Sequence, residues 1–325
     1  MKKLNSFTSS FDMNTIPKFL RQISLFTLLL ILFNVALFFL VSGFYIKDYD
    51  EVDLDYSQYI LADSHGIPLG DHTEGHQVHN FSNHSDSYLD MERKLKFLIR
   101  NTEVKRIYLS VDDHTLSPTR EKQNNLDRSS YYADENDFSS FDSFLRNKYL
   151  NYYCVFLNDR YSLVIKNFIE EELFDFSKWG GSTYKIAWEK LSEKEKLQIS
   201  QERINHYFDY QDPSQNMAHA LERIILLCRE KNIELIGIKF PLTKTYVELM
   251  DKESYKADSV FRSYQLPIVD FDSLFLEQDS LFRDMDHLDN GGGMKFVDIL
   301  FDSLDNKEMV KQTQYNTKVG SELGK

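Results

Sequence analysis

Serine, histidine and aspartate, the residue types of a nucleophilic acyl-transfer site, stand near the two ends of this 325-residue sequence. Ser64 follows the apolar run 57–62 (SQYILA), and His287 comes three residues after Asp284. A serine hydroxyl needs a base that takes its proton and an acid that orients the base. His287 is well placed as that base and Asp284 as that acid, although each piece by itself is a common chance pattern.

Polar residues also follow the runs 77–82 (QVHNFS) and 104–111 (VKRIYLSV), which are typical of strands. In an open parallel sheet, ligands bind beyond the carboxyl ends of the strands. The residues that we expect around Ser64 are therefore those directly after the three strands: Asp63, His65, Asn83, Ser85, Asp86, Asp112, Asp113 and His114.

The elements that must position these residues alternate along the chain. Helical spacing of apolar residues marks 87–101, 217–231 and 293–304, and further strands are predicted at 233–240 and 266–271. Strands that alternate with helices predict a parallel sheet covered on both faces.

The segment 112–215 interrupts this order. Residues 112–137 are polar and rich in turn residues, which predicts a surface loop. Residues 138–210 hold 17 aromatic side chains, Trp179 and Trp188 among them, in mostly helical patterns. Two interpretations are open: an inserted helical subdomain with its own small core, or a lid that presents aromatic faces to a sugar or a lipid.

The two end blocks together resemble those of the SGNH/GDSL hydrolase superfamily. Residues 60–66 (ILADSHG) are similar to its first block, and residues 282–292 (FRDMDHLDNGG) are similar to its last block, Asp-x-x-His-Leu-Asn-x-x-Gly. The membrane-anchored branch, with proteins of alginate O-acetylation and teichoic-acid D-alanylation, resembles this chain most. The resemblance implies a three-layer α/β/α sandwich with a flavodoxin-like parallel sheet. It also implies that Ser64 is the nucleophile, His287 the base and Asp284 its partner.

An acyl-transfer site also needs donors for the negative charge that develops on the acyl oxygen. By the resemblance, the backbone N–H of Ser64 is one donor. The glycine of the second block is missing, and Asn83 or Ser85 could substitute for it. Asp112 or Asp113 stands where the third block has an asparagine; because a carboxylate only accepts hydrogen bonds, His114 is the replacement candidate. Ala62 replaces the glycine of the first block.

A membrane anchor is predicted near the N-terminus. Residues 23–46 are 24 nearly all apolar positions without a charge. A helix of that length is about 36 Å long and can cross a hydrocarbon core of about 30 Å. A cleaved signal peptide is the alternative, but its apolar region usually has only about 7–15 residues. Cations precede the stretch and acids follow it, which predicts a cytoplasmic segment 1–22 and an extracytoplasmic domain 52–307 with a polar tail 308–325.

Charge and composition exclude several classes of function. The net charge is −13, and four of the 38 cations precede residue 47, so the rest of the chain is more acidic still. Binding to a phosphate backbone needs clustered cations, so a nucleic-acid partner is not expected. Two cysteines, Cys154 and Cys228, exclude a four-cysteine zinc site, and we expect both to pack as small apolar side chains. We expect no cofactor, and no metal at the four closely spaced histidines His72, His76, His79 and His84, because Gly70 and Gly75 interrupt any helical face there.

Two functions remain open. The first is serine-dependent O-acyl transfer or ester hydrolysis, through an acyl-Ser64 intermediate, on a cell-surface or exported glycan or an acylated small molecule. The second is a catalytically weak or inactive partner of a membrane-bound O-acyltransferase, which the missing glycine and asparagine donors favour.

Overall fold

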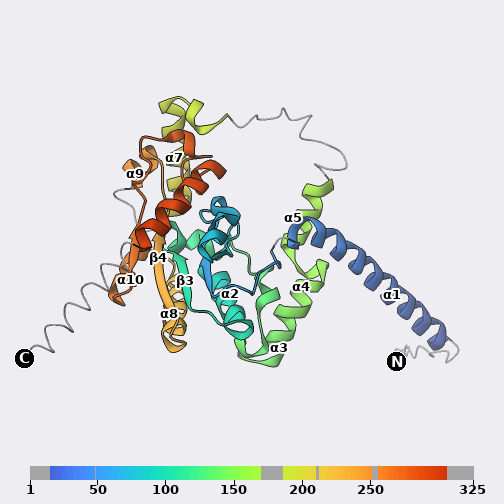
Figure 1. Cartoon of the computed structure of the whole chain (residues 1–325). Coiled ribbons are helices and arrows are strands. Elements are labelled where there is room, and N and C mark those ends of the chain that lie inside the picture. Colours follow the sequence, from blue (N-terminus) through green and yellow to red (C-terminus); the bar gives the residue numbers. More distant parts are fainter. Residues whose placement is uncertain (1–14, 48, 170–185, 210–211, 251–254, 306–325) are drawn as a thin grey trace, which may run out of the picture.

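The computed structural model describes residues 15–47, 49–169, 186–209, 212–250 and 255–305. Within them a parallel sheet is covered by helices, and one long helix projects from the domain (Figure 1). The strands are β1 (Gln58–Leu61), β2 (His79–Asn80), β3 (Arg106–Ser110), β4 (Glu234–Lys239) and β5 (Ile268–Asp270). Their order is β2-β1-β3-β4-β5 and every neighbouring pair is parallel, which is the flavodoxin-like order. The predicted α/β fold is confirmed.

Alternation along the strands divides the core into two layers. Tyr59 and Leu61 of β1 point to the face covered by the helices α2 (Tyr88–Asn101), α8 (Gln215–Glu230) and α10 (Ala257–Ser263). Ile60 points to the opposite face, which is covered by α7 (Glu193–Phe208), α9 (Lys244–Met250) and the last helix, residues 290–305. Each fully buried Leu or Ile side chain of these layers contributes about 1.5–3 kcal/mol. Both faces are buried, as the predicted sandwich requires.

The two edge strands are shorter than their sequence patterns predict. β2 covers two residues of the run 77–82, and β5 covers three of the run 266–271. The chain after β2 nevertheless stays beside β1, because the Phe81 N–H donates to Ile60 O (3.0 Å) and the Asn83 N–H to Ala62 O (3.2 Å). The loop that follows β2 is therefore held next to the loop that follows β1.

Residues 112–137 are not the surface loop that their polarity predicts. They fold as short 3-10 turns: η3 (Asp113–Leu116) and η4 (Pro118–Glu121) pack against α8, and η5 (Ser129–Tyr132) packs against α2 before η6 (Glu135–Asp137). Arg120, Asn125 and Tyr132 are buried. The polar side chains can be buried because each finds a partner: Asp90 of α2 accepts from the Asn125 N–H (3.1 Å) and from Ser129 Oγ (2.7 Å).

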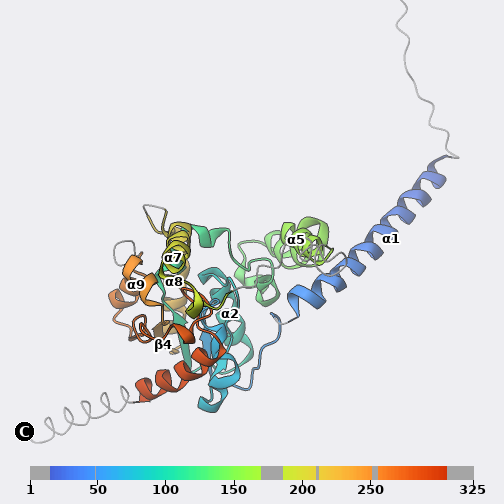
Figure 2. The ribbon, with the colours of Figure 1, turned by 90° about the horizontal axis from the view of Figure 1, so that it is seen from above.

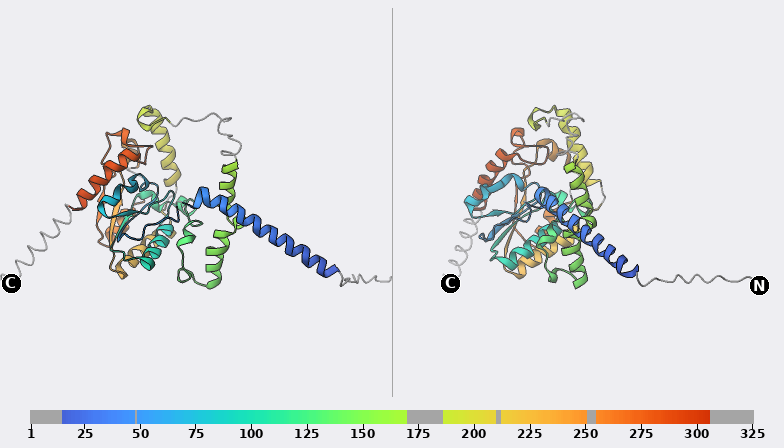
Figure 3. Two further views of the ribbon diagram at one scale, coloured as in Figure 1. Left: turned by 45° about the vertical axis from the view of Figure 1, so that its right-hand side comes forward. Right: turned by 90° about the vertical axis from the view of Figure 1, so that its right-hand side faces the viewer.

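The projecting helix is α1 (Thr15–Val41), continued by η1 (Ser42–Ile46). Together, residues 16–46 form one helix that is long and apolar enough to cross a membrane, with its most apolar part unburied. Figure 2 and Figure 3 show that the N-terminal part of α1 extends away from the rest of the protein. This agrees with the anchor predicted at 23–46.

A helical arm, defined here as residues 141–168, lies between the sheet domain and α1 (Figure 3). It consists of α3 (Phe141–Phe144), η7 (Leu145–Leu150), α4 (Asn151–Tyr153), η8 (Val155–Leu157) and α5 (Asp159–Phe168). Tyr152, Val155 and Tyr161 of the arm share an apolar cluster with Val41 and Ile46 at the end of α1.

The predicted separate core of the segment 138–210 is therefore not what the structure shows. Tyr152, Tyr153 and Phe156 of the arm pack on α1. After the arm, Trp188, Tyr207 and Phe208 belong to the main core of the sheet domain. Trp179 lies outside the described residues. Cys228 is buried in the core and Cys154 is half-buried, and neither is in a disulfide.

Candidate active site

Ser64 lies on the tight turn that leaves β1. The Asp63 side chain shapes this turn, because its Oδ1 accepts from the His65 N–H (3.1 Å), and the Gly66 N–H donates to Asp63 O (3.1 Å). Gly66 is required here: a Cβ at this position would lie 2.2 Å from Ser82 Oγ in the loop after β2. The close approach of the two loops leaves the Ser64 side chain half-buried.

His287 and Asp284 are held by a closed turn before the last helix. Phe282 and Leu288 form an antiparallel bridge, and Asp284 Oδ1 accepts from the His287 N–H (3.0 Å) inside the turn. Thr243, after β4, donates from its N–H (3.2 Å) and its hydroxyl (2.8 Å) to Met285 O. The turn is thereby fixed to the carboxyl end of the sheet, next to Ser64.

Glycines dock this turn and the last helix. A Cβ on Gly292 would come within 2.2 Å of Leu281 O, and one on Gly293 within 1.9 Å of Pro68 O. Contacts this short exclude any larger residue. The last helix can therefore pack directly against the chain that follows Ser64, and this contact sets the separation of Ser64 and His287.

The three residues predicted for acyl transfer form one chain of hydrogen bonds. His287 Nε2 lies 2.7 Å from Ser64 Oγ, and His287 Nδ1 lies 2.7 Å from Asp284 Oδ1. These distances are those of a base in contact with a nucleophile and of an acid that orients the base. The arrangement can take a proton from Ser64 and return it to a leaving group.

A second carboxylate, which the sequence analysis did not assign, also contacts His287. Asp286 Oδ1 lies 2.9 Å from His287 Nδ1, and Asp286 Oδ2 lies 3.3 Å from Nε of Arg203 in α7. Asp286 is buried, and Asp284 is more exposed. Because Asp286 directly precedes His287, the sequence did contain a signal for this second carboxylate. Arg203 comes from a distant helix, and no local pattern indicates its contact with Asp286.

The two carboxylates change the protonation of the imidazole. Burial lowers the pKa of His287, but Asp286 and the hydrogen bond to Asp284 raise it to about 10. Burial raises the pKa of Asp286, but His287 and Arg203 bring it well below its usual range. The two carboxylates therefore favour the imidazolium form of His287, and only the neutral form can accept the proton of Ser64.

Two further histidine–carboxylate pairs lie under the site. His65 Nδ1 is 2.9 Å from Asp112 Oδ2, and His114 Nε2 is 2.7 Å from Asp63 Oδ2. The His65 ring stands 5.0 Å from the His287 ring and 4.6 Å from the His114 ring. The loops after β1 and β3 and the turn before the last helix therefore meet at one place, as the strand-end rule predicts.

Charges in this layer are fixed by their partners. Burial raises the pKa of Asp63, but His114, His65 and Arg120 bring it well below its usual range; the Arg120 side chain lies 3.0 Å away. Burial lowers the pKa of His65, and Asp63 and Asp112 raise it by more. Burial lowers the pKa of His114 more than Asp63 raises it.

The aspartates after β3 have different positions. Asp112 accepts from Ser110 Oγ (2.8 Å) and from the Phe240 N–H (2.9 Å), in addition to its contact with His65. Asp113 turns toward other elements, because it accepts from the Ala257 N–H (3.1 Å) and lies 3.6 Å from Lys239. Asp112 therefore belongs to the layer under His287, and Asp113 ties β3 to α10.

The oxyanion donors expected from the sequence lie in two places. The backbone N–H of Ser64 belongs to the same residue as the reacting Oγ. Asn83 lines a cavity of about 350 Å³ together with Ser82 and His84 of the same loop and with Phe44 and Lys47 at the end of α1. Ser85, in the same loop, has a left-handed backbone (φ 65°).

His114 is the remaining oxyanion candidate. Its Nε2 donates to the Asp63 carboxylate, and its lowered pKa favours the neutral ring, so Nδ1 carries a lone pair and cannot donate to an oxyanion.

Asp86 belongs to a buried ion pair under the site. Asp86 Oδ2 lies 2.5 Å from Nζ of Lys94, and both side chains are fully buried. Asp86 also accepts from the Tyr49 hydroxyl (3.0 Å) and, through its backbone carbonyl, from Arg120. It therefore anchors the loop after β2 and does not face Ser64 as a reacting group.

Two groups in the described part of the chain have the geometry to hold a cation: Asp63, His65 and His114, and His65, Asp286 and His287. A guanidinium already pairs with the carboxylate of each group, Arg120 with Asp63 and Arg203 with Asp286. An added cation would be repelled by these charges, so the residues do not fit a metal well. None of the four closely spaced histidines, His72, His76, His79 and His84, belongs to either group, and His72 and His76 are exposed.

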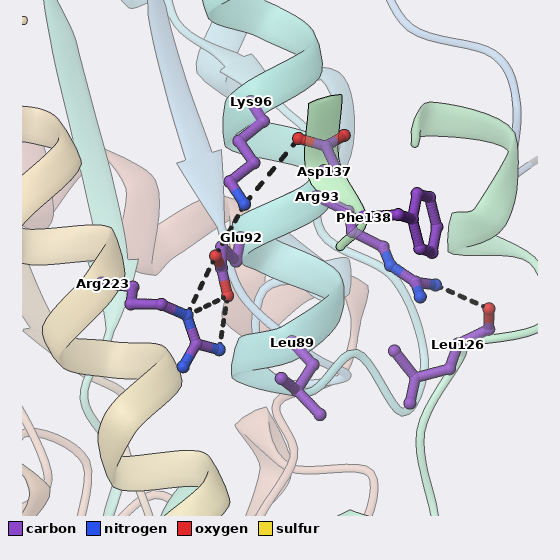
Figure 4. Close-up of a pocket in the computed structure, with 8 residues that line it drawn as sticks. All are labelled: Leu89, Glu92, Arg93, Lys96, Leu126, Asp137, Phe138 and Arg223. Atoms are coloured by element: carbon purple, nitrogen blue, oxygen red, sulfur yellow. Dashed lines mark hydrogen bonds and ion pairs between the residues drawn. The ribbon is translucent and has the colours of Figure 1, made fainter. Parts of the chain in front are cut away.

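A second cavity, of about 420 Å³, is lined by residues of α2, by Arg223 of α8 and by Leu126, Asp137 and Phe138 (Figure 4). Arg223 binds both oxygens of Glu92, and Lys96 lies 2.9 Å from the same carboxylate and 3.8 Å from Asp137. Arg93 donates to Leu126 O (2.8 Å) and to Ser129 Oγ (3.0 Å), so each charged side chain of this cavity has a partner.

Comparison with known proteins gives distant structural likenesses and no match in sequence. No protein-family profile matches the chain, and no curated protein matches it. A solved structure from Bacteroides fragilis, provisionally described as an acylhydrolase, is similar with 7% identity and a TM-score of 0.38. The match covers 82% of this chain and 96% of that one. This likeness is too distant to assign a function.

Proposed function

We propose that this protein transfers or hydrolyses acyl groups through a covalent acyl-Ser64 intermediate. The hydrogen-bond chain Ser64–His287–Asp284, with both contacts at 2.7 Å, carries the proposal. Once neutral, His287 takes the Ser64 proton while Oγ bonds to the ester carbonyl carbon. The tetrahedral intermediate collapses, the ester C–O bond breaks, and the alcohol leaves with the proton from His287. Water or a sugar hydroxyl then releases the acyl group by the reverse steps.

The substrate class follows from the resemblance to the membrane-anchored SGNH branch. We infer an O-acylated glycan at the cell surface or in export, or a small acylated donor. This placement requires the sheet domain to be outside, with residues 1–22 in the cytoplasm. Reporter fusions after residue 47 and after residue 305 test it: alkaline phosphatase fused at either point should be active, and inactivity at both would reverse the topology.

The test of the enzyme proposal uses the full chain in lipid nanodiscs. We expect hydrolysis of an aryl acetate and labelling by a serine-directed phosphonate at pH values near the pKa of His287. Ser64→Ala should abolish the label and lower kcat by at least about 10³-fold. Ser273→Ala, which changes an exposed serine, is the control and should retain both. Unchanged labelling of Ser64→Ala would refute the proposal.

A second function has its own supporting observation. The two carboxylates raise the pKa of His287, which favours its protonated form, and the glycine and asparagine donors of the second and third blocks are missing from this sequence. A partner protein of a membrane-bound O-acyltransferase, without catalysis at Ser64, would have such a site. In that case Ser64→Ala would preserve glycan acylation in cells, and the purified chain would show no phosphonate label at any pH.

A further inference from the structure

Asn34 is a polar side chain in the middle of the apolar helix α1. Its amide bonds to the arm on both sides: Nδ2 donates to Tyr153 O (2.9 Å), and Oδ1 accepts from the Val155 N–H (2.8 Å). These two groups flank Cys154, where the backbone leaves the helical region between α4 and η8 (φ −94°, ψ 99°). Asn34 therefore satisfies the backbone where the helical structure of the arm is interrupted.

Aromatic contacts continue along α1 from this point to its end. Phe33 packs on Phe156 with ring centroids 6.0 Å apart, and Phe44 packs on Phe168 at 4.6 Å. The contact thus runs over eleven residue steps, about 16 Å of helix. The arm is attached to the second half of the apolar stretch 23–46, not only to its end.

The length of α1 then fixes where the arm must be. The apolar residues before the contact, 23–32, extend about 15 Å as a helix, and a hydrocarbon core is about 30 Å thick. α1 can cross the membrane only if the part that holds the arm is also inside. A broken helix at this depth needs protein partners for its backbone, and Asn34 supplies them.

The surface of the arm suits such a place. Residues 149–158 carry no charge. Leu150, Phe156, Leu157 and Leu163 expose 50–56% of their surface. The flanking cations turn back to the sheet domain: Lys148 Nζ donates to Ala133 O (2.7 Å), and Arg160 donates to Lys122 O (2.5 Å). This is the pattern of charged ends at an interface around an apolar middle.

We propose that the uncharged part of the arm, residues 149–158, is immersed in the membrane leaflet nearest the sheet domain, where lipid acyl chains cover Leu150, Phe156 and Leu157. The inference rests on α1 as a membrane span and not on the chemistry of Ser64. The protein is then held by two elements, one that crosses the bilayer and one that enters only one leaflet. Because the end of α1 also lines the cavity at Asn83 and His84, this cavity opens near the lipid headgroups.

Tryptophan quenching by lipids tests the immersion. Leu157→Trp and, as control, Leu226→Trp are made in the full chain; Leu157 is 56% exposed and Leu226, on α8 of the sheet domain, is 50% exposed. Both are reconstituted in nanodiscs whose phospholipids carry bromine on the acyl chains. After subtraction of the natural tryptophans, the emission added at 157 should fall by about half, since an embedded face lies about 5–10 Å below the headgroups. The emission added at 226 should not change.

Equal emission from both variants in brominated and ordinary lipid would overturn the proposal, because residue 157 would then be in water. A spin label at Leu157→Cys, with Cys154 and Cys228 replaced by alanine, gives a second measurement. Immersion predicts that the label collides more with oxygen than with a water-soluble nickel chelate. Greater access to nickel, or access to neither because protein covers the arm, would contradict immersion in lipid.

Discussion

The rim of the sheet at Ser64 and the contact of α1 with the arm bury polar groups in opposite ways. At the rim, ionisable side chains meet one another: His287 lies between Asp284 and Asp286, and His114 lies against Asp63. At the arm, one neutral amide, Asn34, meets two backbone groups within an apolar surface. Both arrangements give polar atoms partners. Only the rim holds ionisable groups whose protons can be transferred. The rim is therefore suited to catalysis, and the arm contact is suited to holding the arm against α1.

Removal of the base should have the largest effect. We expect His287→Gln to lower kcat of the purified chain by about 10⁴-fold or more, because Ser64 loses its proton acceptor. Steady-state hydrolysis of an aryl acetate in nanodiscs measures this. His76→Gln, at an exposed histidine outside the site, is the control. Similar rates for the two variants would show that the rim residues take no part in the reaction.

Removal of the buried anion under the site should mainly affect stability. Asp63→Asn leaves Arg120 buried without its carboxylate, and we expect a loss of about 3–5 kcal/mol in the free energy of unfolding. Urea denaturation followed by circular dichroism measures it, with the exposed Asp302→Asn as control. A loss no larger than that of the control would show that Arg120 finds another partner.

The two carboxylates on His287 can be separated by their pH profiles. Because Asp286 raises the pKa of His287 toward about 10, kcat/KM should increase with pH as the imidazole loses its proton. Asp286→Asn should shift this increase to lower pH by more than Asp284→Asn does and raise the relative rate at pH 7, whereas Asp284→Asn should also lower the maximum. Profiles that coincide with that of the natural protein would exclude control by Asp286.

The same group links stability to pH. The raised pKa of His287 contributes stability below about pH 6.5, its value in an unfolded chain. That contribution is lost as pH rises through about 10, where the folded protein releases the proton.

The arm contact should give the smallest effect and leave the chemistry unchanged. Asn34→Leu removes both partners of the interrupted backbone at Tyr153 and Val155, and we expect the arm to lose about 1–3 kcal/mol of its attachment. Hydrogen exchange of residues 149–158 in nanodiscs should become faster. Thr27→Leu, on the part of α1 before the contact, is the control, and unchanged exchange in Asn34→Leu would contradict the role of the amide.

Much of the fold and part of the site could be predicted because their signals are local. The apolar runs of β1, β3 and β4 and the amphipathic pattern of α2 and α8 lie within short windows. Ser64, Asp284 and His287 were predicted as site residues because each lies in a recognisable block; the structure places them in contact, and their catalytic roles stay a prediction. The buried turns of residues 112–137 were missed, since their polar side chains are paired with Asp90 and other distant residues that no local window contains.

The sequence by itself determined an apolar helix long enough to cross a membrane, the alternation that builds the sheet, and the residue types at the rim, because hydropathy and period act over neighbouring residues. Only the tertiary structure decided that Asp286 and Arg203 share His287, that Arg120 neutralises Asp63, and that Asn34 holds the arm. These pairs join residues far apart in the chain. Buried charges and amides must find partners, and which partners they find depends on how the layers pack.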